Sequence, residues 1–278
     1  MPVKTKPDIQ TVLLGILALI AGVLVLTLLI SLIFGGPKAP EEAPTEPTEE
    51  ATLPPPEANP YDAADFDYEN GYLTCVAGES IMGIDVSEFQ HQVDWNAVKE
   101  AGVEYVILRV GFRGYSTGAV KADARALANY QGAKAAGLKI GVYFFSQAIT
   151  SEEARAEANF LLGFTEGWDL QMPVVYDWEY IKAEARTGKM DARTLTDCTI
   201  AFCETIQAAG HTPMVYFNKN QGEKLLYLEE LTDYPFWLAW YSDEMDYPYY
   251  VEMWQYTNKG EVPGIKGDVD VNIWMPIE

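Results

Sequence analysis

The sequence predicts an α/β protein whose main domain is an incomplete (β/α)8-like barrel, preceded by one transmembrane helix and a Pro/Glu-rich linker. Beyond residue 80, short apolar runs of strand length alternate with amphipathic stretches, as in repeated βα units. Eight such runs are present, which is the number that closes a parallel barrel. No GxGxxG or GxxxxGK motif follows any of them, so a doubly wound sheet with a phosphate-binding turn is disfavoured.

The N-terminal segment predicts a membrane anchor. Residues 12–34 carry no charge and nothing more polar than Thr27 and Ser31. At about 1.5 Å per residue, they can cross a hydrocarbon core of about 30 Å. The run is longer than the apolar region of a cleavable signal, and no small-x-small site or cysteine follows it closely, so we expect an uncleaved anchor. Lys4 and Lys6 precede it, which places the N-terminus in the cytoplasm and the main domain outside, on a single-pass cell-membrane protein.

A linker separates the expected anchor from the expected barrel. It holds half of the 16 prolines together with Glu, Ala and Thr. This composition cannot bury apolar area and favours extended polyproline II, so we interpret the linker as a passive spacer. The chain is therefore predicted to consist of a cytoplasmic segment (1–11), a transmembrane helix (12–34), the linker (35–60), a lead-in (61–80) and the barrel domain (81–278).

The expected strands are short runs rich in β-branched and aromatic residues, bounded by turn-forming residues. They comprise residues 82–86, 105–110, 140–145, 174–179, 214–217, 236–240, 253–256 and 269–273. The segments after the sixth and seventh strands are rich in Asp, Pro and Gly and leave little room for a crossover helix. We therefore expect the barrel to be incomplete in its last third.

Four amphipathic stretches predict helices between the earlier strands. The first two are residues 95–101 and 123–136, the third begins after Thr150, and the fourth runs through Ala209. A glycine follows three of the four, where a left-handed residue commonly ends a helix; these are Gly102, Gly137 and Gly210. Thr150 and Glu153 have the spacing of a capping box at the start of the third helix.

Acidic residues lie in three of the expected strands. The period of two in residues 174–179 places Asp177 and Glu179 on one face, which points into the barrel mouth if the apolar face packs on helices. Asp85 ends the first strand and Asp270 lies in the last, and these two strands are neighbours in a closed barrel. Close carboxyls in a low-dielectric pocket raise one another's pKa, so one can stay protonated beside an ionised neighbour. This arrangement suits glycosidic bond cleavage, although spacing alone equally fits an acidic strand end bound to a basic partner or a cation.

Aromatic residues are frequent at the same strand ends. Their faces can stack on the C–H faces of a pyranose ring, so an acidic cleft with aromatic walls fits a sugar polymer better than a nucleotide. A single aromatic residue more often packs in a core than binds a substrate. The candidates for contact with a substrate are Tyr143, Tyr216, Trp240, Trp254 and Tyr256.

The charge and the cysteine content exclude other classes of protein. The chain has 19 Lys and Arg against 41 Asp and Glu, a formal net charge of −22, which leaves no cation to neutralise nucleic acid phosphates. Three cysteines and two histidines argue against a disulfide scaffold and against a metal centre. We expect no metal, no cofactor and no nucleic acid partner.

Several motifs follow one another in an order that is specific. They are GIDVS at 83–87, VDW at 93–95, LRVG at 108–111, GVY at 141–143, PVVYDWE at 173–179, WQY at 254–256 and GDVDVN at 267–272. In this order they resemble glycoside hydrolase family 25, the Chalaropsis-type lysozymes or N-acetylmuramidases. The resemblance implies cleavage of the β-1,4 bond between N-acetylmuramic acid and N-acetylglucosamine in peptidoglycan, on a flattened, incomplete β/α barrel.

The resemblance also implies roles for the four acids. Glu179 is the general acid, Asp177 its partner, and Asp85 and Asp270 line the same site. Asp177 could act as nucleophile, as base for water, or as the group that orients the 2-acetamido oxygen of the substrate, and we favour the last. The expected partners are the glycan strands of peptidoglycan and, through the N-terminal helix, the membrane.

Two alternatives stay open at this point. Another glycosidase acting on N-acetylated sugars, such as a chitinase-like enzyme, would normally show a DxxDxDxE series, which residues 169–179 do not supply. A wall-binding module with a dead site would gain nothing from keeping four acids so close together.

Overall fold

The computed structural model describes residues 53–276. The expected cytoplasmic segment, the expected membrane span at residues 12–34 and most of the expected linker lie outside these residues. Within the described residues, no helix is both long enough and apolar enough to cross a membrane.

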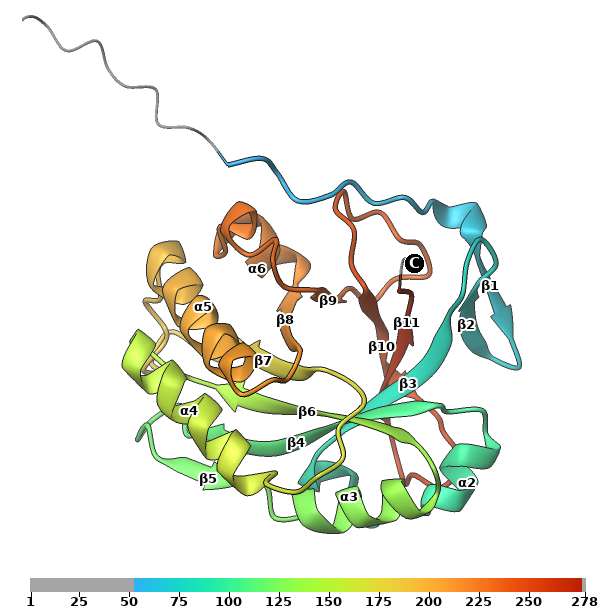
Figure 1. The fold of residues 1–278 in the computed structure, drawn as a ribbon. Coiled ribbons are helices and arrows are strands. Elements are labelled where there is room, and N and C mark those ends of the chain that lie inside the picture. The colour runs from blue at the N-terminus through green and yellow to red at the C-terminus, as the bar shows by residue number, and fades with distance from the viewer. Residues whose placement is uncertain (1–52, 277–278) are drawn as a thin grey trace, which may run out of the picture. The chain divides into compact units, whose positions relative to one another are not determined.

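Eight strands close into a barrel (Figure 1). In ring order the neighbours are β3, β11, β10, β9, β8, β7, β6 and β4, and β4 pairs back with β3. All eight expected strands are confirmed, with differences of a few residues at their ends. Their bounds are β3 (Ile81–Val86), β4 (Tyr105–Arg113), β6 (Lys139–Ser146), β7 (Val174–Trp178), β8 (Pro213–Asn218), β9 (Phe236–Ala239), β10 (Met253–Gly260) and β11 (Val269–Trp274).

A (β/α)8-like barrel would have eight parallel strands, but the strands of this barrel are not all parallel. β11 runs antiparallel to both of its neighbours, β10 and β3, while the other ring pairs are parallel. The connection from Gly260 to Val269 explains this difference. A parallel crossover needs about a dozen residues or more, so a connection this short can only return the chain in the opposite direction. A further short strand, β5 (Val120–Ala122), pairs with β4 outside the ring.

Helices pack on the outside of the first two thirds of the barrel (Figure 1). The four expected helices are confirmed as α2 to α5, and a short α6 was not predicted. The glycines expected to end helices adopt φ values of +100° at Gly102, +74° at Gly137 and +86° at Gly210. The helices are α2 (Trp95–Glu100), α3 (Ala126–Ala135), α4 (Ser151–Phe164), α5 (Ala192–Ala208) and α6 (Lys219–Lys224), with 3-10 turns η1 (Ala63–Asp65), η2 (Glu88–Gln90) and η3 (Leu228–Glu230).

The expected capping box of α4 forms only in part. The Thr150 hydroxyl accepts a hydrogen bond from the Glu153 backbone N–H at 3.3 Å. The Glu153 carboxylate, however, accepts from the Ile149 backbone N–H at 3.0 Å and pairs with Arg186, rather than returning to Thr150. A charged partner from a distant loop therefore takes the place of the local one.

The lead-in forms a β-hairpin that was not predicted. It consists of β1 (Phe66–Glu69) and β2 (Tyr72–Cys75), joined by Asn70 and Gly71 at φ of +54° and +87°. An Asn-Gly pair between strand-like runs is the strongest local signal for a two-residue hairpin turn, because both positions need a positive φ. The signal was present in the sequence.

The hairpin covers the outer face of β10, where the incomplete barrel has no helix. Phe66 packs edge to face on Trp254 at 5.3 Å between ring centroids, and Tyr68 packs on Tyr256 at 6.5 Å. The Leu73 backbone N–H donates to the Tyr256 hydroxyl at 3.3 Å. The predicted lack of crossover helices in the last third is confirmed, and the hairpin supplies part of the missing cover.

Apolar side chains form two layers on either side of the strands. The inner layer fills the barrel and comprises Tyr105, Ile107, Met172, Val175, Met214, Tyr216, Trp237, Ala239 and Met253. The larger outer layer lies between the strands and the elements around them, and includes Val174, Tyr176 and Trp178 of β7. The alternation predicted for β7 is therefore confirmed, and the interior below the barrel mouth is packed rather than hollow.

The bottom of the barrel depends on a close approach between β3 and β4. A Cβ atom on Gly83 would lie 2.1 Å from the ring of Tyr105, which is fully buried in the inner layer. Only a glycine leaves room for this ring, because real Cβ contacts are never that short.

We expect Gly83→Ala to destabilise the domain by about 1–3 kcal/mol, because the added methyl group overpacks the barrel interior. The measurement is the midpoint of urea unfolding followed by circular dichroism. Gly163→Ala is the matched control, since a Cβ there meets nothing within 4 Å, and alanine favours the helix. Equal midpoints for the two variants would contradict the packing argument.

Candidate active site

Four carboxyl groups meet at one end of the barrel. Asp85 on β3, Asp177 on β7, Asp270 on β11 and Glu179, which follows the last residue of β7, all line a cavity of about 230 Å³. Parallel strands end at the same rim, which brings Asp85 to Asp177 and Glu179. Asp270 lies near the start of its strand, and it reaches the same rim because β11 runs the other way, with Asp270 opposite Asp85.

The Asp85 carboxylate is held by two amide side chains. Its Oδ2 accepts from Gln255 Nε2 at 2.8 Å and from Asn272 Nδ2 at 2.9 Å. The Gln255 oxygen accepts from the Tyr241 hydroxyl at 2.9 Å, and the Asn272 oxygen accepts from Trp237 Nε1 at 2.9 Å. Indole N–H can only donate, so Asn272 must present its NH2 group to Asp85.

Burial raises the pKa values of Asp85 and Asp270, and like charge raises that of Asp85 further. For Asp85, burial is the main cause, the charge of Asp270 adds to it, and the two amide donors oppose it. Burial raises the pKa of Asp270 to about 6, against an opposing hydrogen bond with Asp85. Because the two carboxyls are neighbours on paired strands, they bind protons as a pair rather than independently.

Asp177 has an oxygen with no partner within the described residues. Its Oδ1 is buried and accepts no hydrogen bond there. Burial, followed by the charges of Glu179 and Asp85, raises the pKa of Asp177, and the guanidinium of Arg109 opposes the rise. A buried acceptor without a donor costs free energy, so this oxygen is available to a donor on a bound ligand.

Arg109 is the cation of the cavity wall. Its Nε donates to Asp123 Oδ2 at 2.8 Å, and its Nη2 donates to Glu88 Oε1 at 3.3 Å. The guanidinium also lies 4.9 Å from the ring centre of Phe89, which lines the same cavity. These contacts hold the guanidinium in place, and its positive charge opposes the rise of the pKa of Asp177.

Glu179 is less buried than Asp177. Burial is the first cause of its raised pKa and the charge of Asp270 is the second. β7 ends at Trp178, so the backbone carbonyls that follow lack a strand partner. Gln221 Nε2 donates to the Trp178 carbonyl at 2.9 Å, and Gln147 Nε2 donates to the Glu179 carbonyl at 2.8 Å. The two glutamine side chains thus donate the hydrogen bonds that a neighbouring strand would donate if β7 continued.

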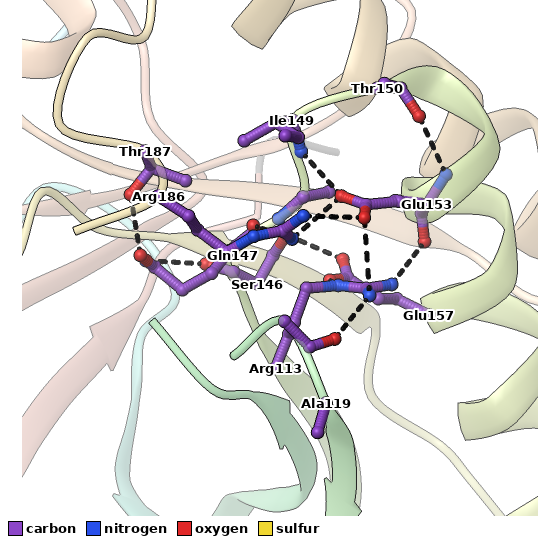
Figure 2. Close-up of polar contacts among 12 residues, drawn as sticks. Arg113, Ala119, Ser146, Gln147, Ile149, Thr150, Glu153, Glu157, Arg186 and Thr187 are labelled. Carbon is purple, nitrogen blue, oxygen red and sulfur yellow. Dashed lines mark hydrogen bonds and ion pairs between the residues drawn. The ribbon is translucent and has the colours of Figure 1, made fainter. Parts of the chain in front are cut away.

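A polar network behind the site fixes Gln147 (Figure 2). Thr187 Oγ1 donates to the Gln147 side-chain oxygen at 2.6 Å, which leaves the NH2 group to face Glu179. Arg186 donates to the Gln147 backbone carbonyl and forms two hydrogen bonds with the Glu153 carboxylate, at 2.8 and 2.7 Å. Helix α4 and the loop after β7 therefore meet at the glutamine that supports Glu179.

A second ion pair extends this network into the protein. Arg113 bonds Glu157, whose other oxygen accepts from Ser146 at 2.6 Å. Ser146 also bonds the Tyr176 hydroxyl at 3.0 Å. All four side chains are buried, so each charge and hydroxyl has a partner in the protein instead of water.

The structure divides the five predicted aromatic residues. Tyr143 and Tyr216 line the cavity with the acids. Trp240, Trp254 and Tyr256 do not line it, and they pack instead in or against the outer layer.

The sequence-based assignment placed Trp254 and Tyr256 in the wall of the acidic cavity, but the structure places both outside it. On β10 the alternation places Met253 and Gln255 inward and the two aromatic residues outward, beneath the hairpin. Trp254 is 0% exposed, and its Nε1 donates to the Trp240 carbonyl at 2.7 Å. The WQY motif therefore contributes its glutamine to the site. The strand period of two separates the two faces of β10, but it does not say which face points inward unless the helix-free side of the barrel is known to need apolar cover.

Sequence reasoning missed several residues of the cavity wall. Trp237 lies one residue inside a short apolar run, where nothing distinguishes an inward residue from an outward one. Arg109 appears in the sequence as one charged residue in a buried strand, which is itself a signal. The missed residues are Ser87, Phe89, Gln90, Arg109, Trp237 and Gln255.

No resident metal site is apparent. Among residues 53–276, no group of three or more His, Cys, Asp and Glu side chains is arranged to hold a metal ion. Cys198 and Cys203 are buried free thiols on α5, and Cys75 is buried on the hairpin.

A β/α barrel with a cluster of buried carboxyls and aromatic walls at its mouth defines a class, the barrel glycoside hydrolases. Within that class the chain belongs to glycosyl hydrolases family 25, whose family model matches residues 84–265. The resemblance drawn from the motifs is confirmed.

Known proteins of similar sequence and fold support this membership. The chain is 27% identical over 210 residues to the uncharacterized protein YegX of Escherichia coli K12, with 71% of each chain covered. It is 27% identical over 216 residues to lysozyme M1 of Streptomyces globisporus, covering 69% of this chain and 67% of that one. Its fold resembles the autolysin LytC of Streptococcus pneumoniae, solved with a synthetic peptidoglycan ligand, at a TM-score of 0.63 and 26% identity over 75% of this chain. This chain spans 52% of the LytC chain.

The raised pKa of Asp270 predicts that stability falls as pH rises. An unfolded aspartate titrates near pH 3.9, so between about pH 4 and pH 6 the folded state binds more protons than the unfolded state. The stabilisation is complete below about pH 4 and is lost as pH rises through about 6. We expect the thermal midpoint of Asp270→Asn, measured by circular dichroism, to drop less between pH 4.5 and pH 7.5 than that of the wild type.

The control for this comparison is Asp268→Asn, which changes an exposed carboxyl two residues away. It should keep the wild-type difference between the two pH values. An identical pH response in wild type and Asp270→Asn would show that Asp270 does not titrate as described.

Proposed function

We propose that this glycoside hydrolase is a lysozyme that cleaves the β-1,4 bond between N-acetylmuramic acid and N-acetylglucosamine in peptidoglycan. The observation that carries the proposal is a pair of carboxyl groups at the end of β7. Asp177 has a buried Oδ1 without a partner among the described residues, and Glu179 has a raised pKa. One group can accept a hydrogen bond from the N–H of an acetamido substituent, and the other can deliver a proton. Family membership, the likeness to lysozyme M1 and the peptidoglycan ligand of LytC support the same substrate.

Glu179 is the proposed general acid. Its raised pKa keeps the carboxyl protonated closer to neutral pH, so that it can give its proton to the leaving glycosidic oxygen as the bond from C1 breaks. The Gln147 amide supports this residue from behind by holding its backbone carbonyl. Afterwards the same carboxylate can take a proton from the water that attacks C1.

Asp177 is the proposed orienting group for the 2-acetamido substituent. Its free Oδ1 would accept the acetamido N–H, and the acetamido carbonyl oxygen would then form the bond to C1 as the leaving oxygen departs. Water next breaks that new bond at C1, which gives overall retention of configuration. A nucleophilic or a base role of the Asp177 carboxylate remains the alternative, and the stereochemistry of the product together with trapping of a covalent intermediate separates the three.

Asp85 and Asp270 have a supporting role in this proposal. The charge of Asp270 raises the pKa of Glu179, and Asp85 holds Asp270 through the pairing of β3 and β11. The protonation state of Asp85 and Asp270 therefore shifts the pH at which Glu179 loses its proton.

We expect Glu179→Gln to lower kcat on purified peptidoglycan by about 10²–10⁴-fold while KM changes little, because the variant keeps size and polarity but cannot donate an acidic proton. Asp177→Asn should be comparably damaging. The measurement is release of reducing sugar by the full chain, with folding checked by circular dichroism.

Glu184→Gln is the matched control for this test, since Glu184 is an exposed glutamate in the same loop. It should keep wild-type turnover. A folded Glu179→Gln variant with wild-type turnover would end the mechanism, and absence of turnover by the wild type would leave only a binding module.

We further propose that residues 12–34 anchor the enzyme in the cell membrane, with the barrel outside. The uncharged run and the preceding lysines support this arrangement, and the proline-rich linker would set the distance to the wall. We expect the full-length protein in the membrane fraction, and protease added to intact protoplasts should remove the barrel. Recovery of a secreted product that starts between residues 37 and 61 would overturn the proposal.

A further inference from the structure

The hairpin builds a second cavity that no part of the proposed mechanism uses. This groove has a volume of about 650 Å³ and lies between the hairpin, the end of β10 and the loop after β9. The hairpin, residues 66–75, lies outside residues 84–265 that match the family model. The groove is lined by Tyr68, Asn70, Gly71, Tyr72, Tyr241, Ser242, Asp243, Tyr256, Thr257, Asn258, Lys259, Gly260, Glu261 and Val271.

The groove adjoins the cavity of the four acids. Tyr241 lines both, and its hydroxyl bonds Gln255, which holds Asp85. Val271, the residue after Asp270, also lines the groove. A chain that leaves the acids past Tyr241 therefore enters the groove.

The sizes of the two cavities require an extended substrate to continue somewhere. The cavity of the acids holds about 230 Å³, below the roughly 300–1,000 Å³ of pockets that enclose drug-sized ligands. A glycan strand cannot be contained there, so most of its sugars must lie along the adjoining surface. The groove provides that surface.

The chemistry of the groove suits sugars that carry acetamido groups. The rings of Tyr68 and Tyr241 are 47% and 51% exposed, and such rings can stack on the C–H face of a pyranose. The Tyr68 hydroxyl is held by Asp243 at 2.9 Å, so its ring is placed before any ligand arrives. The side chains of Asn70 and Asn258 are exposed and add donors and acceptors of the kind that pair with acetamido and hydroxyl groups.

We propose that the hairpin groove is a binding site for the sugars of the glycan strand that lie beyond the cleaved bond. The inference rests on the proposed function, because the strand is the substrate assigned to the neighbouring acids. The groove would make the enzyme prefer long strands over short fragments. The stem peptide of peptidoglycan is the other part of the substrate that could lie there, but two exposed aromatic faces fit rings better than a charged peptide.

The test compares two substrates of the full chain, both free of stem peptide: long glycan strands and a tetrasaccharide of the same repeat. We expect Tyr68→Ala to lower the ratio of kcat/KM for long over short substrate about tenfold, chiefly through KM on the long strands. Tyr68→Phe keeps the ring and should retain most of the ratio. Tyr227→Ala, which removes a partly exposed tyrosine ring just before η3, is the control and should leave the ratio unchanged.

A second variant guards against a folding defect, since loss of the Tyr68 ring uncovers Tyr256. Asn258→Ala changes a groove residue that belongs to β10 rather than to the hairpin, and it should lower the same ratio. An unchanged ratio in both variants overturns the inference, as does an equal loss on both substrates. A loss that appears only when stem peptides are present overturns it in favour of peptide binding. If the wild type cleaves neither substrate, the proposed function fails instead.

Discussion

The crowding of four carboxyl groups at the mouth of a closed barrel is the constraint on which the rest of the site depends. Like charges in a buried cavity repel one another, so each group must bind a proton, find donors or face a cation. The protein uses all three: Asp270 has a pKa of about 6, Asp85 receives two amide donors, and the guanidinium of Arg109 opposes the pKa rise of Asp177. Among residues 53–276, Oδ1 of Asp177 is a buried carboxyl oxygen with no hydrogen-bond partner, and a donor on a substrate could bind it.

Holding these acids in place requires support at the point where β7 stops. The sheet ends at Trp178, and its hydrogen bonds are continued by the side chains of Gln221 and Gln147. Gln147 is in turn tied to Thr187 and to Arg186, which bonds Glu153 of α4. The position of the general acid therefore depends on residues from helices α4 and α6, from the loop after β7 and from the end of β6, so a substitution at any of these should affect Glu179.

One side of the barrel has no helices, and this explains both the presence of the hairpin and the outward position of Trp254 and Tyr256. β10 carries Trp254 and Tyr256 outward, and apolar rings on an uncovered strand would face water. The hairpin covers them with Phe66 and Tyr68, and its far edge forms the wall of the groove beside the acids. The hairpin that covers these rings thus also adds the groove surface next to the site.

The sequence by itself determined the eight strands, four helices and the rim at which Asp85, Asp177 and Glu179 gather, because hydrophobic period and strand parity are local properties. Asp270 joins them only because β11 runs antiparallel to β3. An Asn-Gly turn even encoded the hairpin. Only the tertiary structure decided which face of β10 points inward, that β11 runs antiparallel, and that Gln147 supports Glu179. These features depend on which elements lie beside one another, and a connection's length or a missing helix acquires meaning only when the barrel closes around it.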